Sequence, residues 1–215
     1  MFVLNRQRTP ARRSCARPVR GFSFIEVLVT MVLISVALIG LAGVGGRASL
    51  SEMESYQRTQ ASLLVQDMVD RMNANRLSGA GATATGNPTN PVVLDTCYSG
   101  QVLGTGYTGT PACAAGSATQ NAQAVADLVA WNAELLGAAE TTSTGRQVGA
   151  MIGAVGCIDT LDAANHIYMV SVHWQGLVAT AAPTAVGACG GNPPSFGAAN
   201  LHRVVTMTLQ VGALL

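Results

Sequence analysis

Side chains that could do chemistry are few and scattered in this chain of 215 residues. His166 and His173 are seven positions apart on a predicted strand, so they lie on opposite faces and cannot easily share a metal ion. His202 is solitary, and we expect all three histidines at the surface or at a sheet edge. No G-x-S-x-G sequence, phosphate-binding loop or H-E-x-x-H zinc motif occurs. The sequence therefore predicts neither catalysis nor a cofactor.

One short group of oxygen-bearing side chains, Asp159, Asp162 and Asn165, falls in a predicted turn between strands. These residues could contact calcium. Their more frequent role is to hydrogen-bond the backbone of the turn itself. We favour the turn, and calcium binding stays open.

Five cysteines are present, and Cys15 lies in the basic N-terminal segment. The other four can form two disulfides in an oxidising compartment, and three pairings are possible. We favour Cys97 with Cys113, a 16-residue separation worth about 3 kcal/mol in the chain-entropy model, and Cys157 with Cys189. Zinc is a weaker alternative because no C-x-x-C spacing occurs.

The charges divide the chain into two unlike parts. All 12 basic residues are arginine, and six of them lie within the first 21 positions, where no acidic residue occurs. The rest of the chain holds six arginines against 11 carboxylates, a net charge of −5. This acidic balance disfavours nucleic acid as a partner.

An uncharged apolar run, VLVTMVLISVALIGLAGV, extends from Val27 to Val44. As a helix its 18 residues span about 27 Å, close to the roughly 30 Å of a bilayer core. The arginines before the run predict a cytoplasmic N-terminus and an exported remainder. The run could be a secretory signal removed after it, a permanent single-pass anchor, or the start of a chain whose leader is cut before it.

The residues that open the run are Gly21-Phe22-Ser23-Phe24-Ile25-Glu26. With the basic segment before them, they resemble the class III prepilin signal, G-F-x-x-x-E, of the type IV pilin superfamily. The resemblance implies that a prepilin peptidase cuts after Gly21 and methylates the new amine of Phe22. It also implies that Glu26 neutralises such an amine while the subunit docks into a growing filament. A lone carboxylate at the bilayer centre costs about 2.5 kcal/mol or more, so a paired cation would offset that cost.

After the run, apolar residues recur at spacings of three and four, which predicts an amphipathic continuation of the same helix. They are Leu50, Met53, Ala61, Leu64, Val65, Met68, Val69 and Met72. Glu54 with Arg58 and Asp67 with Arg71 stand four apart, and we expect both as solvated ion pairs on the exposed face.

These patterns divide the chain into a leader at 1–21, a transmembrane and filament-core helix at 22–46, an amphipathic continuation at 47–77, and a head at 78–215. In the head, a Gly-, Ala- and Thr-rich composition predicts a surface loop over 78–120 with little core. A second helix is expected at 121–139, and strands are expected near 147–159, 166–175 and 201–211. One antiparallel sheet packed on the long helix gives an α+β head, the layout of the type IV pilin fold.

Two further stretches resemble PilV-type minor pilins, also called type IV pilus modification proteins. One is the helical segment 56–76, and the other combines 172–176, 189–190 and 203–206. The resemblance implies a subunit held in the bacterial inner membrane with its head in the periplasm. It would join other minor pilins to prime pilus assembly and could then enter the extracellular pilus. Adhesion and twitching motility would depend on it indirectly.

The partners that this resemblance implies are the prepilin peptidase, other minor pilins, the major pilin and the inner-membrane assembly platform. Two alternatives stay open. The chain could be a type II secretion pseudopilin, or a secreted enzyme or ligand-binding domain whose apolar run is an ordinary signal sequence.

Overall fold

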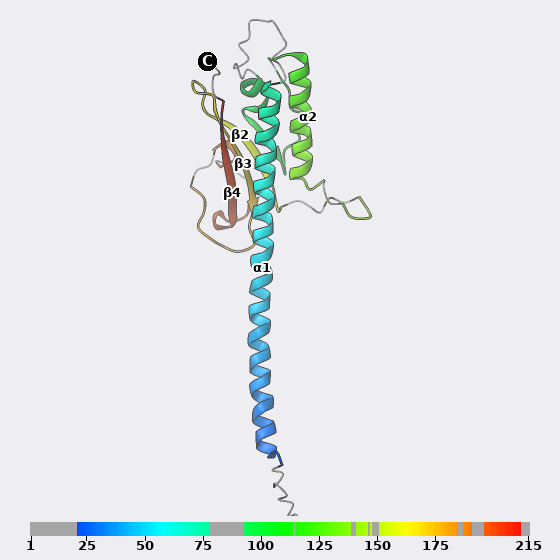
Figure 1. Cartoon of the computed structure of the whole chain (residues 1–215), viewed down its shortest axis with the longest axis vertical. Helices are drawn as coiled ribbons and strands as arrows, with labels where there is room; N and C mark the ends of the chain where they lie inside the picture. Colours follow the sequence, from blue (N-terminus) through cyan, green and yellow to red (C-terminus); the bar gives the residue numbers. More distant parts are fainter. Residues whose placement is uncertain are drawn as a thin grey trace, which may run out of the picture. The chain divides into compact units, whose positions relative to one another are not determined.

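The computed structural model describes residues 21–77, 93–113, 115–138, 141–145, 147, 151–184, 187–190 and 196–211. The predicted leader apart from Gly21, and the first part of the predicted loop, lie outside these residues. The chain forms two compact units, Met1–Gly46 and Arg47–Leu215. Helix α1 (Phe24–Leu77) contributes to both units (Figure 1). The other elements are η1 (Leu94–Tyr98), β1 (Gln101–Gly104), α2 (Ala118–Leu135), β2 (Val155–Asp162), β3 (Ile167–Gln175), α3 (Gly187–Gly190), η2 (Ala199–Leu201) and β4 (His202–Gln210).

A four-stranded antiparallel sheet lies at the centre of the second unit, in the order β1-β2-β3-β4. The register places Val102 opposite Cys157, Cys157 opposite Ser171, and Ser171 opposite Thr206. Each strand therefore pairs with the next one along the chain. Helix α2 lies in the connection between β1 and β2. The result is the α+β layout of a long N-terminal helix with an antiparallel sheet, consistent with the type IV pilin fold.

One face of the sheet packs against the second half of α1 and against α2. The apolar stripe of α1 is buried from Ala61 onward, whereas Leu50 and Met53 are exposed. Arg203, the second residue of β4, contacts Glu54, so the sheet ends near Glu54 along α1. The residues of α1 before Glu54 are therefore not covered by the sheet. The core that forms there includes Val65, Met68, Met72, Leu128, Trp131, Ile158, Tyr168, Val170, Val172 and Trp174.

Glycine allows α2 to approach the sheet closely. A Cβ built on Gly156 would lie 2.3 Å from the ring of Trp131, so any side chain at this point of β2 would force the two elements apart. The start of α2 is fixed by Ser117, whose side chain accepts from the Gln120 N–H in a capping box. This cap explains why the helix begins before residue 121, the predicted start.

The opposite face of β2 carries a smaller apolar cluster. Val155, Cys157, Cys189 and Phe196 form it, with Val102 packed against them. Alternate residues of β2 therefore contribute to two separate cores, one on each side of the sheet. Cys189 and Phe196, which lie between β3 and β4 in the chain, cover part of the face that α1 and α2 leave open.

The predicted loop over 78–120 differs most from the structure. Its described part contains β1 and the turn η1, in which Leu94, Cys97 and Tyr98 are buried. The composition of the segment did not predict these elements, because its few large side chains are surrounded by glycine and threonine. The predicted first strand is also shifted, since β2 covers 155–162 rather than 147–159.

Candidate processing and assembly site

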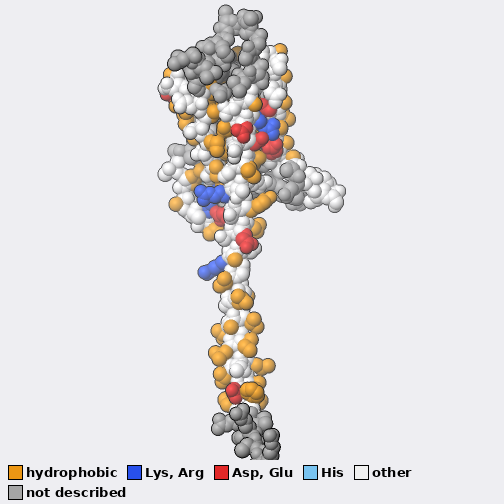
Figure 2. All heavy atoms as spheres, in the orientation of Figure 1, with side chains coloured by type: hydrophobic (Ala, Val, Ile, Leu, Met, Phe, Trp, Pro, Cys, Tyr) orange, Lys and Arg blue, Asp and Glu red, His pale blue; other side chains and the backbone are white. Residues whose placement is uncertain are grey.

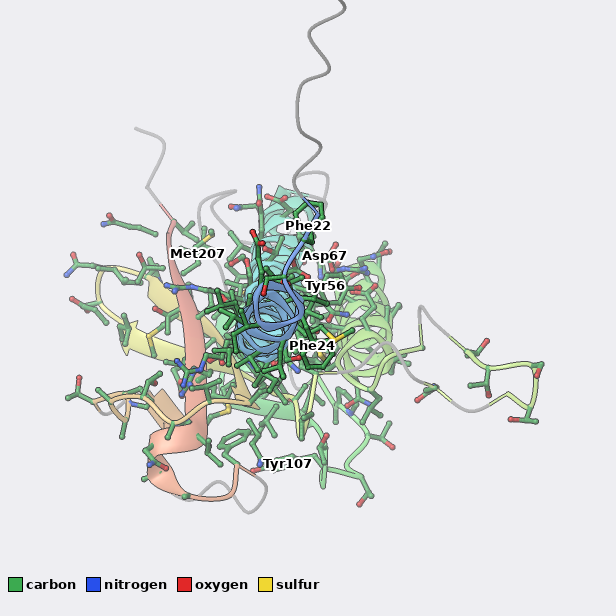
Figure 3. All side chains as sticks on the ribbon, turned by 90° about the horizontal axis from the view of Figure 1, so that it is seen from below. Phe22, Phe24, Tyr56, Asp67, Tyr107 and Met207 are labelled. Atoms are coloured by element: carbon green, nitrogen blue, oxygen red, sulfur yellow. A yellow bond between two sulfur atoms is a disulfide. The ribbon has the colours of Figure 1, made fainter. Side chains whose placement is uncertain are left out.

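The prepilin-like motif lies at the start of α1. Gly21, Phe22 and Ser23 are non-helical and exposed, and the helix begins at Phe24. The Ser23 carbonyl accepts a hydrogen bond from the Glu26 N–H at 3.0 Å, which closes the first turn. The side chain of Phe22 is 85% exposed (Figure 3). The peptide bond after Gly21 is therefore in an accessible, non-helical segment, the form that a peptidase needs to bind.

Glu26 is the carboxylate of the first helical turn. The positive end of the helix dipole favours a negative charge there by about 0.3–1 kcal/mol. Among the described residues, no cation lies within ion-pairing distance of this carboxylate. The Glu26 side chain is exposed at the start of the helix.

The helix surface over residues 24–46 is apolar and uncovered. The most apolar 18-residue window of α1 has a mean hydropathy of 2.7 and no buried residue, so the helix is long and apolar enough to cross a membrane. Thr30 Oγ1 donates to the Val27 carbonyl at 2.8 Å, and Ser35 Oγ donates to the Met31 carbonyl at 2.8 Å. These hydroxyls therefore present no unpaired donor to lipid. Apolar side chains cover the visible face of this segment (Figure 2).

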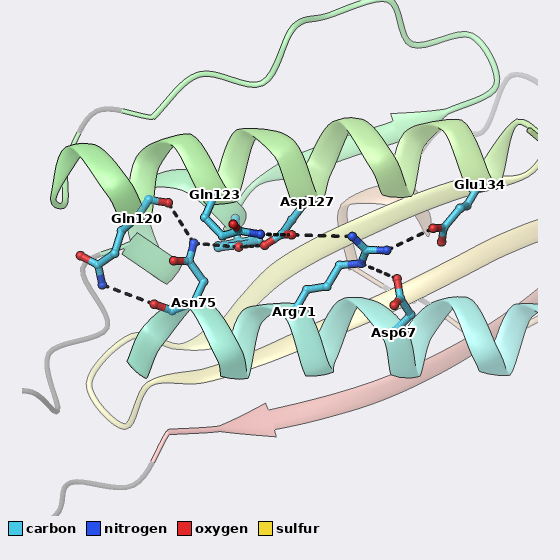
Figure 4. A network of polar contacts seen from close by, with 8 residues as sticks. Asp67, Arg71, Asn75, Gln120, Gln123, Asp127 and Glu134 are labelled. Carbon is cyan, nitrogen blue, oxygen red and sulfur yellow. Dashed lines mark hydrogen bonds and ion pairs between the residues drawn. The ribbon is translucent and has the colours of Figure 1, made fainter. Parts of the chain in front are cut away.

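A network of polar side chains joins α1 to α2 and η1 within the second unit (Figure 4). Tyr98 Oη donates to Asp127 Oδ2 at 2.6 Å and accepts from Asn75 Nδ2 at 2.9 Å. Asn75 Nδ2 also donates to the Gln120 carbonyl at 2.9 Å, and Gln123 Nε2 donates to Asp127 Oδ1 at 2.8 Å. Three separate elements are therefore fastened by hydrogen bonds that are largely shielded from water.

Arg71 supplies the positive charge of this network. Its Nε lies 2.6 Å from Asp67, its Nη2 lies 3.1 Å from Glu134, and its Nη1 lies 3.6 Å from Asp127. Asp67 and Arg71 form the predicted pair, but the Arg71 side chain is only 27% exposed and also bridges to Asp127 and Glu134. Burial and then the charge of Asp67 raise the pKa of Glu134, against the effect of Arg71. Burial and the hydrogen bond to Asp127 raise the pKa of Tyr98, so this phenol stays protonated. It therefore keeps its hydrogen bonds, and the network holds α1, α2 and η1 together.

The second predicted ion pair, Glu54 with Arg58, does not form. Glu54 Oε1 instead accepts from Arg203 Nε at 2.6 Å. Arg203 also donates to the carbonyl of Asn200 at 3.1 Å and to that of Val178. Sequence spacing could not reveal this arrangement, because 149 positions separate Glu54 from Arg203.

The histidines also differ from the prediction. His173 is buried, and its Nδ1 lies 2.8 Å from Nε2 of His202, so His202 is not solitary. Phe196 stacks on His202 with 4.5 Å between ring centroids, while His166 lies in the turn before β3. Burial and then the charge of His202 lower the pKa of His173 to about 3, so this imidazole is neutral at physiological pH. Both imidazoles are buried on the face of the sheet that lies opposite α1 and α2.

The acidic group at the β2–β3 turn hydrogen-bonds its own backbone. Asp162 Oδ1 accepts from the N–H groups of Ala164 at 2.9 Å and Asn165 at 3.1 Å, and Asn165 Nδ2 donates to Asp162 Oδ2 at 2.6 Å. The side-chain hydrogen bond from Asn165 contributes most to the lowered pKa of Asp162. Within the described ranges, no group of three or more His, Cys, Asp or Glu side chains could hold a metal ion.

The four predicted disulfide cysteines are joined in two pairs. Cys97 is bonded to Cys113 with 4.6 Å between their Cα atoms, and Cys157 is bonded to Cys189 with 6.0 Å between theirs. These are the two pairs that the sequence favours. The first connects η1 to the segment before α2, and the second connects β2 to α3.

Residues 16–42 match the family model described as the prokaryotic N-terminal methylation motif. The match covers the end of the basic segment, the Gly21–Phe22 junction, Glu26 and most of the apolar run. No curated protein and no solved structure matches the chain. The motif, the apolar helix and the α+β layout together support a place for this chain in the type IV pilin superfamily.

Proposed function

We propose that the protein is a minor pilin, a structural subunit without a catalytic role that helps to prime assembly of a type IV pilus. The match of residues 16–42 to the N-terminal methylation motif carries this proposal. The exposed apolar helix that follows the motif suits both a membrane anchor and the core of a filament. A PilV-type identity rests on the resemblance of the helix and sheet segments alone.

Three residues have separate roles in this proposal. Cleavage after Gly21 releases the amine of Phe22, and methylation then modifies that amine. Glu26 pairs with such an amine of a neighbouring subunit during docking, because a carboxylate in an apolar bundle needs a cation. The exposed, non-helical Gly21–Phe22 junction supports these assignments, and so does Glu26, which has no ion-pair partner within the described part of the chain.

The proposal also sets the location and the partners. The basic N-terminal segment keeps the N-terminus in the cytoplasm and the head in the periplasm, following the positive-inside rule. The prepilin peptidase processes the chain in the inner membrane. The subunit then contacts other minor pilins, the major pilin and the assembly platform, and it can be incorporated in the extracellular pilus.

Intact-mass analysis of the chain purified from its membrane tests this function. We expect a mature protein that begins at Phe22 and carries one added methyl group, and we expect Gly21→Leu to accumulate uncleaved. Cleavage beyond Val44 would instead support a secreted domain with an ordinary signal. Loss of surface pili on deletion of the gene would support a minor pilin, whereas loss of protein secretion with normal pili would support a pseudopilin.

A further inference from the structure

Two adjoining hollows lie along α1 in the second unit. The larger, of about 660 Å³, extends along α1 from Arg47 to Arg58 and has Val178 and Thr180 on its other wall. The smaller, of about 220 Å³, lies against Trp174 and Arg203. Both hollows share Glu54 and Arg58. We refer to the two together as the basic groove. Figure 2 shows basic side chains at separate points along the molecule, with acidic side chains between them.

The basic groove has an excess of positive charge. Arg203 neutralises Glu54 and also holds the carbonyl of Val178, which fixes the second wall. Arg47 and Arg58 have no carboxylate within ion-pairing distance among the described residues. These arginines are 11 residues apart, so they lie within about 20° of the same side of the helix and about 16 Å apart along it. The groove therefore presents two cations in a line.

The indole N–H of Trp174 lies at the smaller hollow of the basic groove. Trp174 is only 2% exposed, it lines the smaller hollow, and its Nε1–H has no hydrogen-bond partner among the described residues. A buried indole N–H without an acceptor is destabilising, because it has lost its hydrogen bond to water. Trp131 offers a contrast, because its Nε1–H donates to the Leu64 carbonyl at 2.9 Å. An anionic group beside Arg58 would supply the acceptor that Trp174 lacks.

We infer that the basic groove binds a helix of another pilin-like subunit through two carboxylates that are 11 residues apart. This inference rests on the proposed function and names the docking surface. A second copy of this chain fits poorly, because no two of the exposed carboxylates of α1, which are Glu26, Glu52 and Asp70, are closer than 18 residues or about 27 Å. A lipid headgroup could reach Arg47, but Arg58 lies about 16 Å farther along the helix, more than the thickness of a headgroup layer of roughly 5–8 Å.

The test follows the two indole N–H resonances of the full, ¹⁵N-labelled chain in detergent micelles. The probe is a synthetic helical peptide with glutamates 11 residues apart. We expect the Trp174 resonance to shift on titration while the Trp131 resonance stays in place. A peptide with glutamates seven residues apart has the same charge on one face, and we expect it to bind at least about threefold more weakly. A peptide with glutamines in both positions should not bind.

Two variants with the same change in net charge distinguish binding in the groove from a general effect of charge on peptide binding. We expect Arg58→Gln to weaken binding by about 3- to 10-fold, the range for a partly desolvated charge contact. Thr208→Glu makes the same change in net charge at an exposed site on β4, and we expect less than a twofold effect. Arg58 makes no ion pair within the described ranges, so its replacement should leave the fold intact.

Several outcomes would overturn the inference. They are equal binding of the three peptides, no effect of Arg58→Gln, self-association of the chain through the groove in sedimentation, or a Trp174 response only to inorganic phosphate or to phosphatidylglycerol vesicles. The proposed function fails separately, because it depends on cleavage and methylation rather than on peptide binding. A processed, methylated chain that ignores the peptide would refute the groove alone.

Discussion

Replacing Arg71 with methionine should destabilise the head substantially. The change removes the cation that contacts Asp67, Asp127 and Glu134, while the volume of the side chain is largely kept. Methionine is a good helix former, so α1 itself should persist. The variant therefore isolates the contribution of the charge to the fastening between α1 and α2.

The size of the effect follows from burial. Breaking a fully buried ion pair costs about 3–5 kcal/mol, and losing an exposed pair costs about 0–1 kcal/mol. The side chain of Arg71 is 27% exposed and that of Asp127 is 5% exposed, and Asp127 keeps its hydrogen bonds from Tyr98 and Gln123. We therefore expect a loss of about 2 kcal/mol, which corresponds to a fall in Tm of about 4–8 °C for a head of this size.

The pH dependence gives a second, independent readout. Burial and then the charge of Asp67 already raise the pKa of Glu134, so this group binds a proton more tightly in the folded head than in the unfolded chain. A raised carboxyl pKa contributes stability that is present below the unfolded pKa and is lost as the pH rises through the folded pKa. Without Arg71 the pKa of Glu134 should rise further. The variant should therefore lose most stability near neutral pH and recover part of it as the pH falls toward about 5.

Urea unfolding of residues 47–215, followed by circular dichroism with the disulfides intact, measures both effects. Arg58→Met is the matched control, because it removes from the same helix an arginine that makes no ion pair with any described residue, and a change within about 0.5 kcal/mol is expected. A loss below about 0.5 kcal/mol for Arg71→Met, or a loss that does not vary between pH 5 and about 7.5, would refute the reasoning.

Three further results are expected. Glu26→Ala should leave leader cleavage intact but abolish docking, so normal piliation by this variant in a strain without the wild-type copy would contradict the docking role. Non-reducing peptide mapping should recover two linked pairs, Cys97 with Cys113 and Cys157 with Cys189, and free thiols or crossed pairs would refute that pairing. Residues 47–215 alone should be a soluble monomer in sedimentation, because the apolar run is gone; aggregation would indicate that the stripe beginning at Ala61 is not covered by the sheet.

Local patterns predicted the elements whose signal lies in their own residues. The apolar run, the amphipathic stripe from Ala61 onward, and the alternation around β3 and β4 all correspond to observed structure. β1 has only four residues. The large buried side chains near it, such as Tyr98, are separated in the sequence by small residues. Periodicity needs several repeats, so a strand this short gives too little pattern to detect.

The contacts between side chains could not be predicted from spacing, because they depend on the register of the sheet. Gln175 lies opposite His202 in the β3–β4 pairing, and this register brings His202 beside His173, two positions earlier on the same face. A shift of one residue would move His202 to the helix side of the sheet. The same register sends Arg203 to the helix side, where it meets Glu54. One pairing thus decides both the histidine pair and the ion pair.

Arg203 links the fold of the head to its proposed docking surface. Its guanidinium joins Glu54 of α1 to the carbonyls of Val178 and Asn200. The ion pair neutralises the negative charge of Glu54 in the basic groove. The hydrogen bond to Val178 fixes the wall of the groove that faces Arg47 and Arg58. Stability and recognition therefore depend on the same side chain. A change at Arg203 would alter both, whereas a change at Arg58 should alter recognition alone, and this difference makes Arg58 the informative position for testing assembly.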